Sequence, residues 1–313
     1  YCKARKGSFA QLHPVEYGAQ TLLGVLARVP QLRPEDIGDV IMGCAMPFGV
    51  QGGNMARLIV QRAGLPDCVT AQTVNRYCSS GLQTIATAAN AIRCGEEDVV
   101  IAGGVESMSL VPMLVGAEDA DPWLAEHRPE VYTTMGITAE NVARQWGISR
   151  ADMDAMAVES HRRAAQAQAG GCFDGQIIPI TVPGPDGGEV VVCRDEGIRP
   201  GTTAETLAGL KPCFLENGSV TAATSSQMTD GAGFVVLMSE EKAAELGVKP
   251  LARFVSFATG GVPAEVMGVG PIEAVPKALR KAGLTLEQMD TIELNEAFAS
   301  QALAVIRTLG MDP

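Results

Sequence analysis

A single cysteine stands between a predicted strand and a predicted helix in the stretch TVNRYCSSGLQTIATAANAIRCG. Cys78 is followed at once by Ser79, Ser80 and Gly81. Free N–H groups and the macrodipole at the start of a helix lower the pKa of a thiol and favour the nucleophilic thiolate. The serines are predicted to cap the helix, and the glycine to let a substrate approach the backbone closely. This context predicts a nucleophilic cysteine, and it also fits a buried, inert one.

An asparagine occupies a similar place near the end of the sequence, in ELNEAFASQALAV. Asn295 follows a predicted strand and precedes an amphipathic helix, so it can hold a water against a developing oxyanion. A plain helix cap explains the same residue, with Glu296 favoured in the first turn by the helix dipole. A further stretch, residues 220–233, is rich in small and hydroxyl side chains. Its spacing fits a ligand channel and a simple turn equally.

Histidine and cysteine spacing predicts no metal site. His13, His127 and His161 are the three histidines; none lies in a stretch typical of an active-site loop, and all are expected at the surface. The eight cysteines form no C-x-x-C pair and no metal-ligand pattern with these histidines. Free thiols indicate a reducing compartment, so a cytoplasmic protein is expected, with an organelle as a second possibility.

Charge and hydropathy narrow the class of partner. The formal net charge is -12 at pH 7, which argues against nucleic acid, because duplex binding needs a positive surface. An anionic small molecule is still compatible with this charge if basic residues gather locally. No apolar run, residues 99–105 included, is long enough to span a bilayer, so no membrane span is expected.

The elements that must position Cys78 are predicted as a β-α-β unit. Val74 ends an extended run, apolar residues then recur at helical spacing, and Gly95 stops the helix. The following run, DVVIAGG, is predicted as a buried strand. A β-α-β unit has a right-handed crossover and belongs to a mostly parallel sheet, so the fold class is predicted as α/β.

The sequence also contains a weak internal repeat. The stretches LLGVLARVPQLRPEDIGDVIMG and VPKALRKAGLTLEQMDTIELN share one order of elements: a helix, a polar turn and a strand. In this alignment Ile37 corresponds to Met289 and Val40 to Ile292. Two related halves packed together are therefore predicted.

A different segment separates these halves. Helices are predicted at TAENVARQWG and ADMDAMAVESHRRAAQAQAGG, and a hairpin at VPGPDGGEVVV. The predicted domains are a first half at 1–107 completed by 219–247, an inserted segment at 108–218, and the start of a second half at 248–313.

Six collinear blocks resemble the thiolase family along essentially the whole chain. They are VNRYCSSGLQTIATAANAIRCG, VIAGGVESMS, MGITAENVARQWGISR, VTAATSSQMTDGAG, MGVGPIEAVPKAL and ELNEAFASQALAV. The resemblance implies a duplicated α-β-α-β-α five-layered core with an inserted loop domain that binds coenzyme A. It also implies that the second half is incomplete in this chain.

The resemblance assigns roles to particular residues. Cys78 matches the acyl-accepting nucleophile, and Asn295 matches the residue that holds an oxyanion-hole water. The CoA- and substrate-binding positions that it implies are Ser226 on the pantetheine arm, Arg199 and Phe214 near the nucleotide and pantetheine, and Met135, Met267 and Phe298 around the acyl group.

The function implied by the resemblance is thiolytic cleavage of a 3-ketoacyl-CoA, or the reverse condensation, through an acyl-cysteine. Coenzyme A and acyl-CoA are then substrates, with no permanently bound cofactor, and the family implies a homodimer or homotetramer. The alternatives are an acetyl-CoA C-acetyltransferase that forms acetoacetyl-CoA, a non-catalytic acyl-CoA-binding scaffold, and a thioesterase-like hydrolase.

This chain departs from the family pattern in two motifs. The family's catalytic histidine lies in a G-H-P motif and its second cysteine in a C-x-G motif, and the sequence contains neither. The internal repeat places their counterparts beyond the last residue, and a strand is expected before Tyr1. The resemblance therefore implies a chain truncated at both ends.

Overall fold

The computed structural model describes residues 1–111, 113 and 119–312, and the chain divides into two compact units. Unit 1 comprises Tyr1–Met113, Gly171–Gly197 and Gln227–Phe254, and unit 2 comprises Leu114–Gly170, Ile198–Ser226 and Val255–Pro313. Residues 112, 114–118 and 313, which belong to the predicted inserted and last segments, lie outside the described residues. The predicted domain boundaries stay a prediction.

Unit 1 is built on a five-stranded sheet with the order β1-β7-β4-β2-β3. Its strands are β1 (Cys2–Lys3), β2 (Asp39–Gly43), β3 (Thr70–Val74), β4 (Val99–Ser107) and β7 (Thr229–Met238). β2 pairs in parallel with β3 and β4, whereas β7 pairs antiparallel with β4 and with β1. β1, β4, β2 and β3 therefore run in one direction, as expected of a mostly parallel sheet, and β7 runs in the opposite direction between β1 and β4, which was not predicted.

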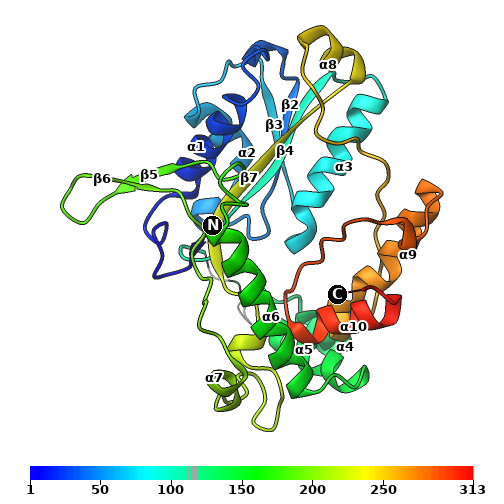
Figure 1. Cartoon of the computed structure of the whole chain (residues 1–313). Helices are drawn as coiled ribbons and strands as arrows, with labels where there is room; N and C mark the ends of the chain where they lie inside the picture. Colours follow the sequence, from blue (N-terminus) through cyan, green and yellow to red (C-terminus); the bar gives the residue numbers. More distant parts are fainter. Residues whose placement is uncertain (112, 114–118, 313) are drawn as a thin grey trace. The chain divides into compact units, whose positions relative to one another are not determined.

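Helices cover both faces of this sheet (Figure 1). On one face α1 (Pro14–Leu26) and α2 (Met55–Arg62) share a hydrophobic core with Val40 and Met42 of β2. On the other face α3 (Ser80–Arg93) packs against Ile41 of the same strand. Successive side chains of a strand point to opposite faces, so burial of all three residues requires both layers of helices. The predicted β-α-β unit, β3-α3-β4, is confirmed.

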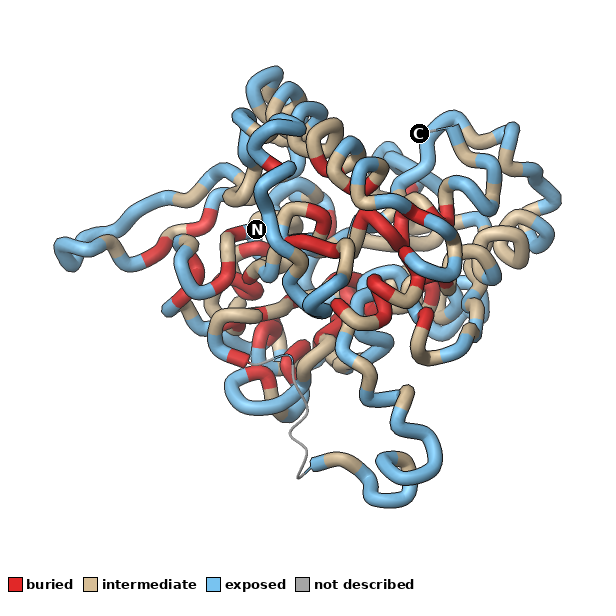
Figure 2. The backbone as a smooth tube through the Cα atoms, turned by 90° about the horizontal axis from the view of Figure 1, so that it is seen from below, coloured by how far each residue is buried: buried red, intermediate tan, exposed pale blue. Residues whose placement is uncertain are grey.

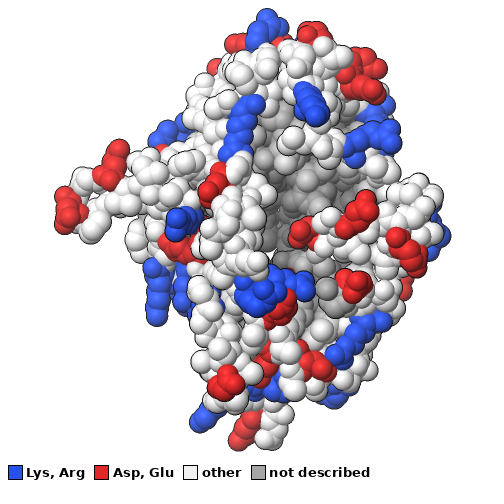
Figure 3. Space-filling view, in the orientation of Figure 1, with Lys and Arg blue, Asp and Glu red and all other residues white. Residues whose placement is uncertain are grey.

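The predicted hairpin is also present in unit 1. β5 (Ile180–Pro183) and β6 (Glu189–Val192) pair antiparallel and project beside α1. The base of the hairpin is buried through Ile180, and its tip is exposed in Figure 2. Figure 3 shows acidic side chains at this tip, while Lys and Arg are interspersed with Asp and Glu over the face in view. A further α-helix of this unit is α8 (Glu240–Leu246).

Unit 2 is helical in its described part. Its helices are α4 (Pro122–His127), α5 (Met135–Gln145), α6 (Arg150–Ala169), α7 (Ala204–Ala208), α9 (Gly270–Ala282) and α10 (Ala299–Leu309). The core joins Val142 of α5, Met153 of α6 and Ala304 of α10, all fully buried. Ser149 and Asp152 form a reciprocal capping box that starts α6. Among the described residues no helix is both long and apolar enough to cross a bilayer.

The strand expected before Asn295 is absent from the described structure, so this prediction is wrong. Residues 291–296 have no regular secondary structure, and Ile292 is 41% exposed. The equivalent strand of the first half, β2, is held by hydrogen bonds to both β3 and β4. No strand among the described residues pairs with residues 291–296, and a segment without a ladder partner leaves its backbone groups unpaired.

Candidate active site

The turn that carries Cys78 lies at the carboxyl edge of the parallel strands, where open α/β sheets bind ligands. β3 ends at Val74, and a short 3₁₀ helix, Tyr77–Ser79, leads directly into α3. Cys78 is exposed, and so is the residue before it, Tyr77, at 64%. The structure therefore presents this residue on the surface of unit 1, and the alternative of a buried cysteine is wrong.

Tyr77 is one of two non-glycine residues with a positive φ among the described residues, at 46°. The left-handed conformation costs a non-glycine residue about 1–2 kcal/mol. Such conformations persist only where surrounding contacts impose them, and they gather at functional sites. Here the N–H of Tyr77 donates to Asn75 Oδ1 at 2.7 Å, and Asn75 Nδ2 donates to the carbonyl of Ala45 at 3.1 Å. This strained residue could not be predicted from the sequence, because a tyrosine carries no turn preference.

The two serines act differently from the predicted helix caps. The hydroxyl of Ser79 donates to the carbonyl of Arg76 at 2.9 Å, and that of Ser80 donates to the carbonyl of Tyr77 at 2.6 Å. Ser80 Oγ also accepts from the N–H of Arg76 at 2.8 Å. Ser79 occupies the N-cap position of α3 without a side-chain capping bond. The predicted caps are therefore wrong, and the hydroxyls fix the turn instead of the helix.

Two glycines near the turn have opposite surroundings. A Cβ on Gly43 of β2 would lie 2.5 Å from Ser80 Cβ, so this glycine allows the start of α3 to approach the strand. A Cβ on Gly81 would meet nothing within 4 Å. Gly81 therefore borders open space, three residues after Cys78, which agrees with the predicted close approach of a substrate to the backbone.

The pKa of the Cys78 thiol is raised above its ordinary value, and the main cause is desolvation by neighbouring atoms. The negative charge of Glu106 raises this pKa further, while a backbone hydrogen bond lowers it. The expected lowering of the pKa at the helix start is wrong for this structure, because desolvation outweighs the helix start. Cys78 is therefore a thiol at neutral pH and needs a base before it can attack.

Replacing Tyr77 tests the strained turn through stability. Tyr77→Gly is expected to unfold with a free energy about 1 kcal/mol higher than Tyr77→Ala, because glycine relieves the left-handed strain while gaining only a little unfolded-state entropy. Both variants lose the same exposed ring, so alanine is the matched control. Urea unfolding measured by circular dichroism gives the difference. Equal stability of the two variants would mean that residue 77 is not held at positive φ.

The other seven predicted site residues belong to unit 2. Asn295 is exposed, and no side-chain hydrogen bond joins it to the described residues. Phe298 occupies the N-cap position of α10, so Asn295 lies outside the helix start. The interpretation of Asn295 as a plain helix cap is therefore wrong, and its amide is free to meet a ligand or water.

Ser226 lies beside the segment that follows Asn295. Its N–H donates to the carbonyl of Ala297 at 2.9 Å, and Ser225 forms an isolated antiparallel bridge with Phe298. The Ser226 side chain is exposed. The structure thus brings the predicted pantetheine serine and the N-E-A-F stretch together within one unit.

Glu140 was not predicted from the sequence, although it holds the backbone at Ser219 and Val220, where the predicted stretch 220–233 begins. Glu140 lies on α5 and is only 5% exposed. Its carboxylate accepts from the N–H of Ser219 at 3.0 Å, from the Ser219 hydroxyl at 3.1 Å and from the N–H of Val220 at 2.9 Å. A buried carboxylate is stabilised by such donors. The signal available in the sequence was a glutamate among the inward-facing small residues of TAENVA.

Aromatic contacts link two of the predicted pocket residues. The rings of Phe214 and Phe298 meet edge to face, with centroids 6.0 Å apart. Gly136, next to Met135, allows this packing, because a Cβ there would lie 2.1 Å from Phe214 Cδ1. Met267 is 41% exposed in a short 3₁₀ helix that packs on α5. Phe214, Phe298 and the start of α5 therefore form one apolar group.

The remaining predicted residue, Arg199, is exposed and its N–H donates to His161 Nδ1 at 3.3 Å. His161 is half-buried on α6, so the expectation of a surface histidine is wrong for this residue. Burial and the nearby charge of Arg199 lower the pKa of His161, so its imidazole ring is neutral at pH 7. Its neighbour Ser160 donates to Glu296 at 2.6 Å, next to Asn295. His13 and His127 are exposed, as expected.

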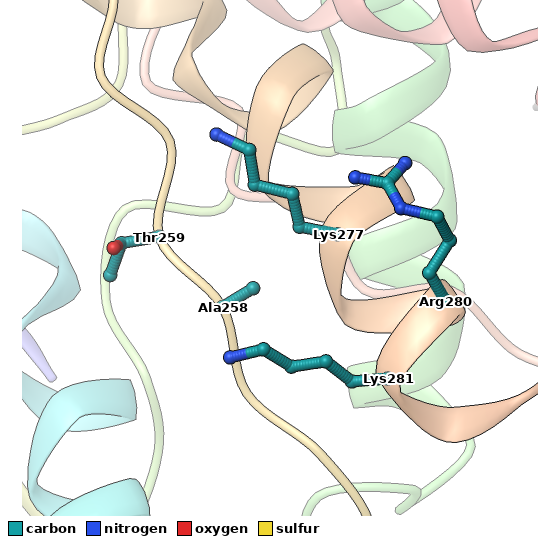
Figure 4. Close-up of a pocket in the computed structure, with 5 residues that line it drawn as sticks. All are labelled: Ala258, Thr259, Lys277, Arg280 and Lys281. Carbon is teal, nitrogen blue, oxygen red and sulfur yellow. The ribbon is translucent and has the colours of Figure 1, made fainter.

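A cavity of about 380 Å³ in unit 2 is lined by none of the predicted site residues (Figure 4). Its lining residues are Ala258, Thr259, Lys277, Arg280 and Lys281. Lys281 reaches from α9 and donates to the carbonyl of Phe257 at 3.0 Å, and Lys277 lies 3.8 Å from Glu273. Cations in the last turns of a helix are favoured by its dipole, so this cluster has a structural cause. Among residues 1–111, 113 and 119–312 no group of three side chains is arranged to hold a metal.

Comparison with known proteins identifies the family. The family models for the thiolase N-terminal and C-terminal domains match residues 2–241 and 248–313. The 3-ketoacyl-CoA thiolase of Bacillus subtilis (strain 168) is 52% identical over 99% of this chain and 81% of its own length. The acetyl-CoA acetyltransferase of Allochromatium vinosum is 44% identical over 98% and 80%. The crystal structure of the Bacillus anthracis acetyl-CoA acetyltransferase superposes with a TM-score of 0.90 and 40% identity, over 99% of this chain and 81% of that one.

The chain belongs to the thiolase family. These matches confirm the predicted resemblance, the predicted thiolase fold and the expectation of an acyltransferase. The roles of the individual site residues are not tested by them.

Proposed function

We propose that the chain is a 3-ketoacyl-CoA thiolase that uses Cys78 as its nucleophile. The observation that carries this proposal is an exposed cysteine, in a turn imposed by hydrogen bonds, at the carboxyl edge of a thiolase-family sheet. The relative that is 52% identical bears the same activity in its name. Coenzyme A and acyl-CoA are substrates in this proposal, and no cofactor is permanently bound.

The reaction runs in two half-reactions through a covalent intermediate. A base takes the proton from Cys78, and the thiolate attacks the 3-keto carbon of the substrate. The bond between C2 and C3 then breaks, so that acetyl-CoA leaves as an enolate that takes up a proton, and the acyl group stays on the sulfur. The thiolate of coenzyme A attacks this thioester and releases the shortened acyl-CoA. The C–S bond of the acyl-enzyme breaks in this step and Cys78 leaves as a thiolate. The enolate of acetyl-CoA has taken up the proton that Cys78 lost, and Cys78 takes up the proton that coenzyme A lost, so the cycle is balanced.

The unit 2 residues are assigned to substrate binding in this proposal. Asn295 holds a water against the oxyanion, and its free, exposed amide supports this role. The exposed Ser226 and Arg199 contact the pantetheine arm and the nucleotide of coenzyme A. The apolar group of Phe214 and Phe298, together with Met135 and Met267, lies against the acyl and pantetheine parts.

A related acetyl-CoA acetyltransferase activity is the second candidate, because two of the similar proteins bear that name. The same acyl-cysteine serves both activities, and they differ in the length of the acyl chain. Relative rates with acetoacetyl-CoA and with longer 3-ketoacyl-CoA substrates separate them.

Trapping of the acyl-enzyme tests the proposed function. The protein is incubated with a medium-chain 3-ketoacyl-CoA without free coenzyme A, digested, and measured by mass spectrometry. The peptide that contains Cys78 is expected to gain the mass of the acyl group, and Cys94, exposed at the end of α3, is the internal control. Acyl mass on another residue would overturn the assignment. Binding of the substrate without any acyl mass would indicate the non-catalytic scaffold, and release of free acid without coenzyme A would indicate a hydrolase.

We also propose a cytoplasmic homodimer or homotetramer. All eight cysteines are free of disulfides, which fits a reducing compartment. Light scattering of the purified protein measures the oligomeric state.

A further inference from the structure

We propose that Glu106 is a positioning residue for the nucleophile, which it holds through the backbone of Ala45 and the side chain of Asn75. Glu106 lies near the carboxyl end of β4, at the same edge of the sheet as the ends of β2 and β3. The inference rests on the proposed function, because it concerns the orientation of the Cys78 thiol. All residues involved belong to unit 1.

The carboxylate of Glu106 gathers the turn that follows β2. It accepts from the N–H of Ala45 at 2.7 Å and from the N–H of Met46 at 3.3 Å. Gln51 Nε2 donates to it at 2.7 Å, and Cys44 Sγ lies 3.9 Å away. Hydrogen bonds from N–H groups to a carboxylate are stronger than those between neutral groups. One half-buried side chain therefore fixes two successive backbone N–H groups.

Gln51 holds the carboxylate in place from the other side. Its side chain is fully buried, donates to the carbonyl of Met46 at 2.9 Å and accepts from the N–H of Ser107. With these donors in place, the oxygens of Glu106 are occupied by hydrogen bonds. Glu106 is therefore suited to hold the turn and not to take the proton of Cys78.

The turn after β2, which Glu106 holds, is connected to Cys78 by a short series of contacts. Ala45, whose N–H is bound by Glu106, accepts from Asn75 Nδ2 through its carbonyl at 3.1 Å. Asn75 Oδ1 in turn accepts from the N–H of Tyr77 at 2.7 Å, and Tyr77 has the strained φ of 46°. Cys78 is the next residue. A displacement of Ala45 is thus passed to the residue whose conformation sets the direction of the thiol.

The charge of Glu106 disfavours the thiolate form of Cys78, so it does not activate the nucleophile. Desolvation has the largest effect on the pKa of Cys78, and a backbone hydrogen bond has the next largest. The charge of Glu106 has a smaller effect and raises the pKa of the thiol. The ionisable groups near Glu106 include Cys44 and Tyr17, whose pKa values are raised mainly by burial, and Arg76, whose Nε donates to Gln83 at 2.9 Å. A residue kept here for electrostatic activation would lower the thiol pKa. Removal of the charge therefore separates positioning from activation.

The test compares Glu106→Gln with Glu97→Gln, which removes a carboxylate of unit 1 outside these contacts. Glu106→Gln is expected to reduce kcat by about tenfold to a hundredfold, because small misplacements of a reacting group cost such factors. KM stays within about twofold in this expectation, because positioning of the thiol acts after substrate binding. Alkylation of Cys78 by iodoacetamide is followed by peptide mass spectrometry as a function of pH. In Glu106→Gln the pH of half-maximal alkylation is expected to fall, because the charge that raises the pKa of the thiol is removed. Glu97→Gln leaves all three quantities at their original values.

A second variant keeps the test decisive if Glu106→Gln folds poorly. Asn75 is exposed, so Asn75→Ala removes the contact between Ala45 and Tyr77 without removing a charge or core packing. Its kcat is expected to fall in the same range as that of Glu106→Gln, with the alkylation midpoint unchanged. Unchanged kcat in both variants would overturn the inference. A raised midpoint in Glu106→Gln would also overturn it, since the charge would then be activating.

Failure of the proposed function is recognised separately. If the acyl group is found on a residue other than Cys78, the proposed nucleophile is wrong, whatever the variants do. If Cys78 is acylated and both variants keep the original kcat, only the role of Glu106 is wrong.

Discussion

Cys78→Ala is expected to lower the rate of acyl transfer by a factor on the order of 10⁴ or more, because the covalent intermediate can no longer form. Cys78 is exposed in the turn before α3, and no second thiol takes its place in that turn. Alanine keeps the turn, since the sulfur has no role in packing that the structure shows. The free energy of unfolding is therefore expected to stay within about 0.5 kcal/mol of the original value.

The measurement follows the loss of 3-ketoacyl-CoA absorbance in the presence of coenzyme A. Cys94→Ala is the matched control, because Cys94 is a second exposed cysteine, at the opposite end of the same helix. This control is expected to keep its full rate. Turnover in Cys78→Ala close to that of Cys94→Ala would exclude Cys78 as the nucleophile.

The local elements around Cys78 were predictable from the sequence because their signals are local. Strand β3 ends at Val74, and α3 ends just before Gly95, which has a φ of 71°. A helix often ends with a residue in the left-handed conformation, which favours glycine, so a glycine in the sequence marks the helix end directly. Hydrophobic periodicity and a glycine stop were enough to place the thiol between a strand and a helix.

The behaviour of the turn itself was not predictable, because it depends on contacts from distant strands. Ser79 and Ser80 were expected at N–H groups of the helix, but they bind carbonyls and an N–H of the preceding turn. The strained φ of Tyr77 depends on Asn75 and, through Ala45, on Glu106 of another strand. Propensities describe a residue in isolation, and they are overridden where tertiary hydrogen bonds decide the backbone.

The predicted site residues of unit 2 also divide into those that a motif identifies and those that only the structure shows. Resemblance to a family named Ser226, Phe214 and Phe298, and the structure places Ser226 beside Ala297 and the two rings edge to face. The buried carboxylate of Glu140, which holds the backbone at Ser219, has no motif of its own. Residues with proposed substrate contacts lie in recognisable sequence motifs. Residues that support the backbone of those motifs can be identified only from their contacts in the structure.

Asn295→Ala is expected to lower kcat by about 10²–10³, which is the usual cost of removing one oxyanion-stabilising donor. The side chain is exposed and makes no hydrogen bond to the described residues, so its removal is expected to leave the free energy of unfolding within about 0.5 kcal/mol. A large loss of rate without a loss of stability is the combination that distinguishes a residue acting on the substrate from one that supports the fold.

The matched control for this prediction is Glu293→Gln, an exposed residue two positions earlier in the same irregular segment. It is expected to keep kcat within about twofold, because it has no proposed contact with the substrate. Asn295→Asp adds a sharper test, since a carboxylate of the same shape repels the developing negative charge and is expected to lower kcat at least as far as alanine does. Steady-state thiolysis and urea unfolding are measured on all three variants. If Asn295→Asp were more active than Asn295→Ala, the side chain would not face the oxyanion, and the role of Asn295 would have to lie in binding coenzyme A.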